Sequence, residues 1–139
     1  MAEKVGNSAI SEGGQIAVQL LSDRRLVMVK LSGGPKPEAI IGMLDELDAL
    51  VGKDPSLQVL IDETDLGPTF IGPGDIARFV AAWRRGTALR STRIAVFVAN
   101  LAMYGLNRMF QGLANSKDRV GVFRDRASAE TWLTEGRAP

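Results

Sequence analysis

The chain has 139 residues, of which 45% are hydrophobic and 24% are charged. A chain of this length can bury enough surface to fold as one domain without a disulfide or a metal ion. It contains neither Cys nor His, which excludes thiol catalysis, Ser-His-Asp triads, thiolate metal sites and most zinc centres.

No apolar run approaches the roughly 18 residues that a membrane-spanning helix requires, and the N-terminal residues lack the apolar core of a signal peptide. We therefore expect a cytoplasmic protein without membrane insertion. Residues 1–14 are expected to form a weakly ordered segment, and residues 15–139 a single domain.

The net charge is +1, but acidic residues dominate residues 1–70 and basic residues dominate residues 71–139. Such an asymmetry would allow two copies of the chain, or a partner, to dock with opposite faces. A folded domain that mixes the two halves in space explains the same pattern without a partner.

The first predicted elements are a hairpin and a helix. Alternating apolar residues predict strands over Gln15–Leu21 and Arg25–Leu31, joined by a tight polar turn. Two glycines and two prolines in residues 32–37 break the pattern. An apolar stripe at helical spacing then predicts a helix over Glu38–Val51.

The rest of the chain alternates strands with helices. The predicted elements are a strand at Leu57–Asp62, a helix from Asp75 to about Arg90, a strand at Arg93–Ala99, a helix from Ala102 to about Asn115, a strand at Val120–Phe123 and a closing helix capped by Asp125.

This order predicts a single-domain α/β fold with a mixed, mostly parallel five-stranded sheet. Strands joined through helices should be parallel, with right-handed crossovers. If the strands lie side by side in chain order, most helices cover one face of the sheet. The other face is then thinly covered, and because Leu60 and Val96 point to opposite faces, some apolar surface is left for a partner.

The segment between the third strand and the next helix is the first candidate site. Its candidate regulatory or contact residues are Asp62, Thr64, Asp65, Thr69, Gly72, Gly74 and Asp75. The spacing Gly72-x-Gly74-x-x-Ala77 resembles a dinucleotide fingerprint, but it begins too far after the strand and Pro73 removes an amide donor.

Two interpretations of this segment remain. Pro73 and Asp75 suit the first turn of a helix, so the glycines and proline could simply begin that helix. Alternatively, Thr64 and Thr69 could make the loop a regulatory or contact surface. The acidic residues at the strand end could bind Mg²⁺, although a solvated strand end is the preferred interpretation.

The helix after the fourth strand provides a second candidate site, for an anion or a partner. Its residues are Asn100, Tyr104 and Arg108. Tyr104 and Arg108 are four residues apart and share a helix face with Gln111 and Asn115. The predicted inward stripe of this helix is Met103, Leu106, Phe110 and Leu113. Arg108 could stack on Tyr104, pair with an acidic residue at the third strand, or bind an anion.

Arginines at positions 78, 84, 85 and 90 lie on or near the preceding helix. They could form a nucleic-acid patch. With so few arginines and no exposed aromatic run, a solvated face is the preferred interpretation, and we expect no nucleic-acid partner.

Three segments carry a resemblance to a known family. They are VLIDETDL, RIAVFVANLAMYGLNRMFQGL and the closing VGVFRDRASAETWL. Together with the order of elements, they resemble the SpoIIAA-like group of STAS-type domains, a superfamily also described as STAS/SEC14-like. The resemblance covers about residues 15–133 and implies a β/α superhelix.

The best-known members of that family are anti-sigma-factor antagonists, which bind a kinase partner. Their switch is a phosphorylated serine in an Asp-Ser-Ser-Gly motif. This chain has Asp62-Glu63-Thr64-Asp65 instead, and no serine lies between Asp62 and Asp75. The resemblance therefore implies an interaction domain but does not carry the phosphoserine switch.

Three classes of function follow. The leading hypothesis is a non-catalytic regulatory or protein-interaction domain that forms a homodimer, with no catalytic residue, metal or cofactor. The second is a binding protein for a small apolar ligand or lipid, whose cavity would be lined by Phe79, Trp83, Phe97, Met103 and Phe110; a filled core is the simpler alternative. The third is an enzyme that works without His.

Overall fold

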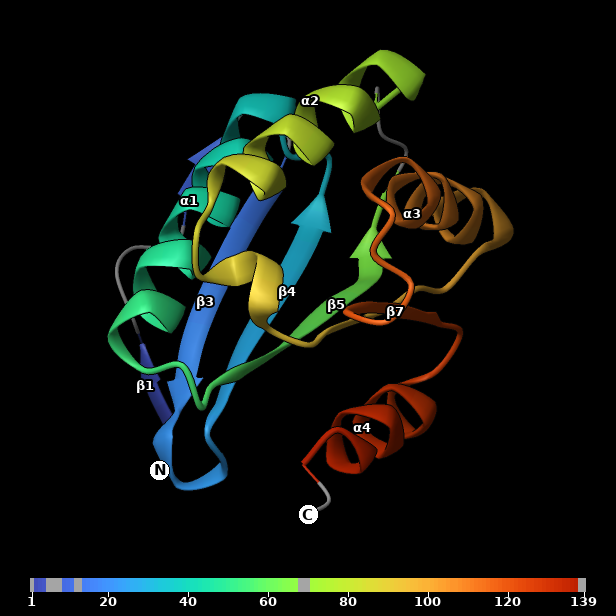
Figure 1. Ribbon diagram of the computed structural model, residues 1–139. Coiled ribbons are helices and arrows are strands. Elements are labelled where there is room, and N and C mark those ends of the chain that lie inside the picture. The colour runs from blue at the N-terminus through green and yellow to red at the C-terminus, as the bar shows by residue number, and fades with distance from the viewer. Residues whose placement is uncertain (1, 5–8, 12–13, 68–70, 138–139) are drawn as a thin grey trace.

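The computed structural model describes residues 2–4, 9–11, 14–67 and 71–137 (Figure 1). The helices and strands follow in the order β1 (Ala2–Lys4), β2 (Ala9–Ser11), β3 (Gly14–Leu21), β4 (Leu26–Gly33), α1 (Pro37–Lys53), β5 (Gln58–Leu66), α2 (Pro73–Arg85), β6 (Ile94–Phe97), α3 (Leu101–Ala114), β7 (Val120–Phe123) and α4 (Arg126–Glu135), with short 3-10 helices at Ser22–Arg24 and Leu89–Ser91.

All strands belong to one mixed sheet. The five predicted strands lie side by side in chain order, from β3 to β7. β3 and β4 form the predicted antiparallel hairpin, and the pairs β4–β5, β5–β6 and β6–β7 are parallel. The α/β class and the mixed sheet predicted from the sequence are therefore confirmed.

Two short strands extend the sheet beyond the prediction. β1 and β2 both pair antiparallel with the outer edge of β3, β1 near its end and β2 near its beginning. The sequence pattern gave no sign of either strand. Each has only three residues, which is too short for an alternation of apolar and polar residues to be recognised.

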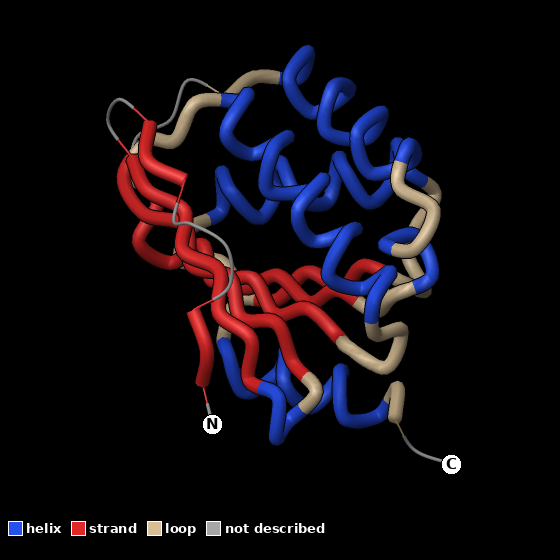
Figure 2. Tube along the Cα trace, turned by 90° about the vertical axis from the view of Figure 1, so that its left-hand side faces the viewer, coloured by secondary structure: helices blue, strands red, loops and turns tan. Residues whose placement is uncertain are grey.

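Three helices cover one face of the sheet. Helices α1, α2 and α3 pack next to each other, and they bury the inward side chains of the strands in the main core. Figure 2 shows this thick helical layer on one side of the sheet and a much smaller one on the other. Apart from the end of α2, the helices begin and end close to the predicted positions.

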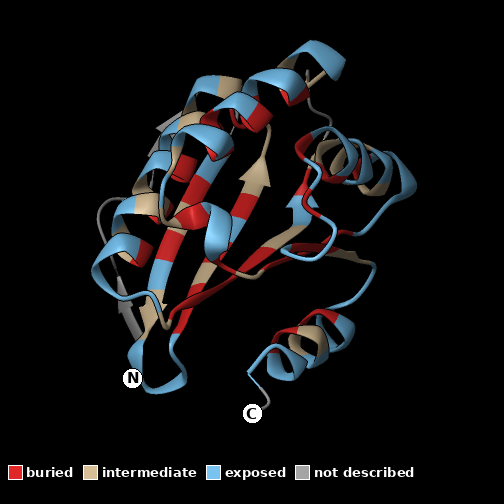
Figure 3. Cartoon of the chain, in the orientation of Figure 1, coloured by how far each residue is buried: buried red, intermediate tan, exposed pale blue. Residues whose placement is uncertain are grey.

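The opposite face is covered by α4 alone. Ala129 and Leu133 of this helix pack on Leu60 and Phe97 in a second, smaller core. Leu60 is fully buried, so the expectation that it contributes to an apolar partner surface is wrong. Figure 3 shows buried positions along the strands and on the side of α4 that faces the sheet. The sequence argument failed because it assigned no packing partner to the closing helix.

Side-chain caps fix the beginnings of α3 and α4. Asn100 Oδ1 accepts the N–H of Met103, and Asp125 Oδ1 accepts the N–H of Ser128. The predicted cap at Asp125 is confirmed. Each cap supplies an acceptor to a backbone donor of the first turn, and so fixes where the helix leaves its strand.

Helix α2 ends earlier than predicted. It stops at Arg85 and not near Arg90, because the next residues are bound by a neighbouring helix. Asp48 Oδ1 of α1 accepts the N–H groups of both Ala88 and Leu89. This pair of hydrogen bonds replaces the helical ones, and Leu89 is buried in the core.

Ion pairs between α1 and α2 bring part of the acidic first half of the chain into contact with the basic second half. Arg85 of α2 pairs with Asp45 of α1, and Arg78 of α2 lies near Glu38 of α1 and Asp75. The basic residues of the second half thus contact acidic residues of the first. Within the described ranges, no helix combines the length and apolar character that crossing a bilayer requires.

Packing of α4 depends on a glycine in β7. A Cβ atom at Gly121 would lie 2.6 Å from Phe123 and 3.1 Å from Trp132. We predict that Gly121→Ala lowers the free energy of unfolding by about 1–3 kcal/mol, because these rings must move. The measurement is urea denaturation followed by circular dichroism.

The control for that prediction is Gly112→Ala on α3. A Cβ there meets nothing within 4 Å, so this variant should gain about 0.5–1 kcal/mol from the better helix propensity of Ala. Equal stabilities of the two variants would contradict the packing described for α4.

Candidate functional site

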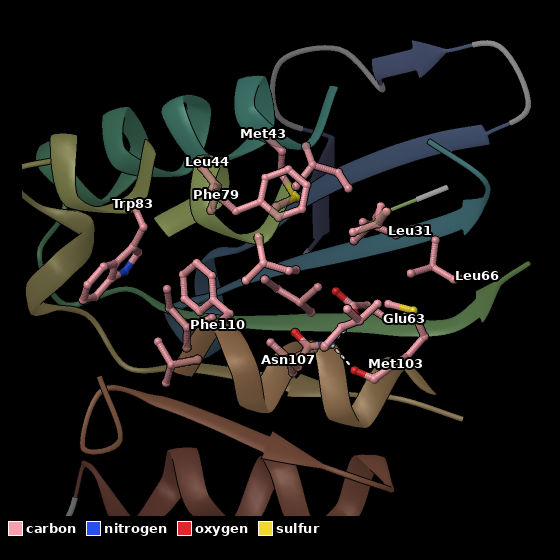
Figure 4. Close-up of a pocket in the computed structure, with 18 residues that line it drawn as sticks. Leu31, Met43, Leu44, Glu63, Leu66, Phe79, Trp83, Met103, Asn107 and Phe110 are labelled. Atoms are coloured by element: carbon pink, nitrogen blue, oxygen red, sulfur yellow. Dashed lines mark hydrogen bonds between the residues drawn. The ribbon is translucent and has the colours of Figure 1, made fainter. Parts of the chain in front are cut away.

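A cavity of about 90 Å³ lies between the sheet and the layer of α1, α2 and α3 (Figure 4). Its lining comes from four strands and three helices: Leu31, Ile40, Met43, Leu44, Ile61, Glu63, Leu66, Ile71, Ile76, Phe79, Trp83, Ile94, Val96, Met103, Leu106, Asn107, Phe110 and Val120. Almost all of these side chains are apolar. The space therefore lies within the main hydrophobic core and is partly open to the surface.

The sequence predicted most of the aromatic lining. Phe79, Trp83, Met103 and Phe110 all contact the cavity, as expected. Phe97 does not, because it points to the other face of the sheet and packs in the core under α4. The error concerns one step of strand alternation: Val96 points into the cavity and its neighbour Phe97 points away.

Two polar side chains lie in this apolar wall. Glu63 comes from β5 and Asn107 from α3, and Figure 4 shows them next to each other. Asn107 Nδ2 donates to Glu63 Oε1 at 2.7 Å and to the carbonyl of Met103 at 2.9 Å. Because these bonds use the amide N–H groups, the side-chain oxygen of Asn107 is left as an acceptor.

Glu63 is held in an environment that opposes ionisation. Although the residue keeps some exposed area, its carboxylate lies among the apolar side chains of the cavity. This burial raises the pKa of Glu63 to about 7, from an ordinary value of 4.5. The hydrogen bond from Asn107 lowers the pKa, and the neighbouring charge of Asp62 raises it further.

Aromatic rings form another part of the wall. The rings of Trp83 and Phe110 meet edge to face, with centroids 6.1 Å apart. The buried Trp83 Nε1 has no hydrogen-bond partner among the residues that the structure describes. In Figure 4, Trp83 lies beyond Phe110 from Glu63, so the cavity has a polar end and an aromatic end.

Strand β5 is longer than predicted and contains a bulge. Lys30 of β4 pairs with Asp62, but Ser32 pairs with Asp65, so one residue of β4 lies opposite two of β5. Asp62 Oδ1 accepts both the N–H and the hydroxyl of Thr64, which stabilises the irregularity. The bulge shifts the alternation by one residue, and this turns Leu66 inward to close the cavity.

The candidate residues predicted at the end of the third strand, which is β5 in the structure, do not come together in one site. Asp62 is used by Thr64, and Asp65 is exposed and pairs with Lys30 at 2.9 Å. Thr69 lies outside the described residues. Within the described part of the chain, no group of three or more acidic residues is arranged to hold a metal ion.

The glycines and the proline of the loop begin α2. Gly72 is the N-terminal cap, Pro73 is in the first turn and Asp75 Oδ2 accepts the N–H of Gly72 at 2.9 Å. Gly74 is exposed in the same turn. Of the two interpretations drawn from the sequence, the helix start accounts for these four residues.

The second predicted site has structural roles as well. Asn100 caps α3. Tyr104 is partly buried beside the main core, and Arg108 Nη1 lies 3.4 Å from its hydroxyl. Of the three options for Arg108, the stack on Tyr104 is therefore the one observed. The interior stripe of α3 also differs from the prediction, since Leu113 is 51% exposed and Gln111 is buried.

Sequence reasoning missed both polar residues of the cavity, although each carried a signal. Val59, Ile61 and Glu63 share one side of a strand at period two. Met103, Asn107 and Phe110 share one side of a helix. Glu63 continues the inward-facing side of the strand, and Asn107 lies on the inward-facing side of the helix. These positions indicate that both polar side chains lie within the core.

Comparison with known proteins adds no identification. The chain matches no protein-family model, and no curated protein shows a significant sequence match to it. The resemblance to SpoIIAA-like domains therefore stays a proposal, and the geometry of the site carries the functional argument.

The raised pKa of Glu63 has a testable effect on stability. A carboxyl that binds its proton more tightly in the folded state stabilises the fold below its unfolded pKa, and this contribution is lost as the pH rises through 7. Glu63→Gln removes the charge and should raise the free energy of unfolding at pH 8 by up to about 3 kcal/mol. At pH 4.5 its stability should match that of the unmodified chain.

Denaturation at several pH values measures this difference. Glu135→Gln, at an exposed position near the end of α4, is the control and should show no such pH dependence. A Glu63→Gln variant whose stability relative to the unmodified chain is the same at both pH values would contradict the buried carboxylate.

Proposed function

We propose that this protein binds a small, largely apolar molecule in the cavity between the sheet and helices α1, α2 and α3. The observation that carries the proposal is a space of about 90 Å³ with an apolar lining and two convergent polar groups. Ligand sites typically combine an apolar wall with a few polar groups that orient the ligand. Protein interiors are otherwise packed closely, with few voids larger than a water molecule.

The position of the cavity agrees with this role. Glu63 is near the carboxyl end of β5, and α3 begins directly after β6 at the same edge of the sheet. In open α/β sheets, ligands bind at the carboxyl ends of the strands. The cavity thus lies near the carboxyl ends of the parallel strands, where ligands bind in proteins of this class.

The size of the cavity limits the ligand. An apolar cavity of about 150 Å³ takes benzene, and a liquid water molecule occupies about 30 Å³. The enclosed part of a ligand therefore has about three to four non-hydrogen atoms. A larger molecule fits only if its remainder extends toward the surface.

Binding of simple apolar probes tests the proposal. Xenon and benzene should shift the amide resonances of lining residues in a two-dimensional NMR spectrum. Val96→Phe, which places a larger side chain in the cavity, should abolish these shifts. Val122→Phe is the matched control, because Val122 pairs with Val96 on the adjacent strand but does not line the cavity.

Retained binding in the Val122→Phe variant and its loss in the Val96→Phe variant support the cavity as the site. Thermal unfolding of both variants checks that they fold. An unmodified chain that shows no shift with either probe would overturn the proposal.

A protein-interaction domain of STAS type is the second candidate. Four strands, β4 to β7, lie in chain order with helices mainly on one face, which supports the β/α superhelix that the resemblance implies. Among the residues whose burial is described, the exposed large apolar side chains are Leu101, Met109 and Leu113, and all three belong to α3. Their common helix favours a contact with a second copy of the chain.

The homodimer can be tested at this helix. Leu113→Glu should shift the protein from dimer to monomer in light scattering at high concentration, because a charge would enter the interface. Ala127→Glu, at an exposed position on α4, should leave the dimer intact. A monomeric unmodified chain would reject this second candidate without affecting the first.

A further inference from the structure

The cavity is chemically asymmetric. Glu63 and Asn107 form its polar end, while Phe79, Trp83 and Phe110 supply three aromatic rings to the rest of the wall. A molecule that fills such a space has a polar head and an apolar tail. The nature of the head follows from the charge and hydrogen-bonding capacity of the polar end.

Within the described part of the chain, Glu63 has no partner of opposite charge. Among the described residues, no Lys or Arg forms an ion pair with it, and it is the single titratable residue in the lining. The nearest charge that acts on it is the carboxylate of Asp62, which is unfavourable. A buried carboxylate without a cation is costly, and the amide of Asn107 offsets only part of that cost.

When Glu63 is ionised, the groups that remain free to form hydrogen bonds at this end are all acceptors. The carboxylate of Glu63 accepts, and Asn107 retains its side-chain oxygen because its N–H groups donate to Glu63 and Met103. A ligand head must therefore donate hydrogen bonds. A positively charged donor also restores the missing partner of Glu63 and makes the stronger, charge-assisted bond.

The aromatic end suits the apolar tail of such a ligand. Aromatic rings supply a large apolar contact surface. The rings of Trp83 and Phe110 meet edge to face there, and the Trp83 N–H has no hydrogen-bond partner among the described residues.

We propose that the cavity binds a small primary amine, with the ammonium group between Glu63 and the side-chain oxygen of Asn107 and the alkyl tail against Phe79, Trp83 and Phe110. This inference rests on the proposed ligand-binding function and specifies the ligand. A carboxylic acid of equal size is disfavoured, because its carboxylate would be repelled by Glu63. An alcohol of equal size donates one hydrogen bond and carries no charge.

Three matched probes separate these classes. Butylamine, 1-butanol and butyrate each contain four carbon atoms and five or six non-hydrogen atoms, so part of each molecule extends beyond the enclosed space. Each is titrated into the unmodified protein at pH 8, where Glu63 is ionised, and the dissociation constant is measured from NMR shifts of lining residues. Butylamine should bind at least about tenfold more tightly than 1-butanol, as expected for a charged hydrogen bond.

Glu63→Gln provides the matched variant, since its amide oxygen can still accept the hydrogen bond of Asn107. In this variant the dissociation constants of butylamine and 1-butanol should be about equal. The comparison of the three probes on the unmodified chain does not depend on the variant, so it decides the question even if Glu63→Gln does not fold.

Each outcome is informative. Equal binding of butylamine and 1-butanol, or tighter binding of butyrate, overturns the amine inference. Binding of benzene without binding of butylamine also overturns it, while the proposed cavity function stands. Failure of all four probes rejects the cavity function and the amine inference together.

Discussion

The hydrogen bond between Asn107 and Glu63 is the contact on which the rest of this account depends. It joins β5 to α3 inside a wall that is otherwise apolar. A carboxylate placed there gains one donor and loses most of its solvation, so its pKa is raised. The raised pKa and the need for a donating ligand both follow from the burial of this carboxylate, while the bond from Asn107 itself lowers the pKa.

The fold places this pair by its asymmetry. Because α1, α2 and α3 all cover one face, that side holds the larger core and the cavity, while α4 alone covers the other. The bulge in β5 shifts the alternation of its side chains by one residue. It lets Glu63 and Leu66 both point inward although they are three residues apart, and so it closes the cavity beyond its polar end.

The sequence predicted the fold better than the site. Alternating strands and helical stripes located the five main strands and four helices, because each buries a periodic apolar face. Leu113 was misplaced since helical spacing alone does not show where a helix leaves the sheet. Glu63 was missed because the strand was expected to end at Asp62, where acidic residues begin. The bulge that extends β5 depends on the Asp62–Thr64 hydrogen bonds, which strand propensity does not reveal.

Ligand binding and protein interaction are compatible in a single domain of this design. The cavity lies beneath α3, through Met103, Leu106, Asn107 and Phe110, and the exposed apolar residues lie on the outside of the same helix. A ligand that contacts Asn107 therefore touches the helix that would meet a partner. Coupling between the two would require a shift of α3.

The most direct test of the central claim is the titration of the Glu63 carboxyl group, followed by its side-chain carbon resonance in NMR. The titration of Glu63 should have its midpoint near pH 7, because burial in the cavity opposes ionisation of the carboxyl group. A midpoint near 4.5 would mean that the carboxylate is solvated, and would contradict both the site and the functions derived from it.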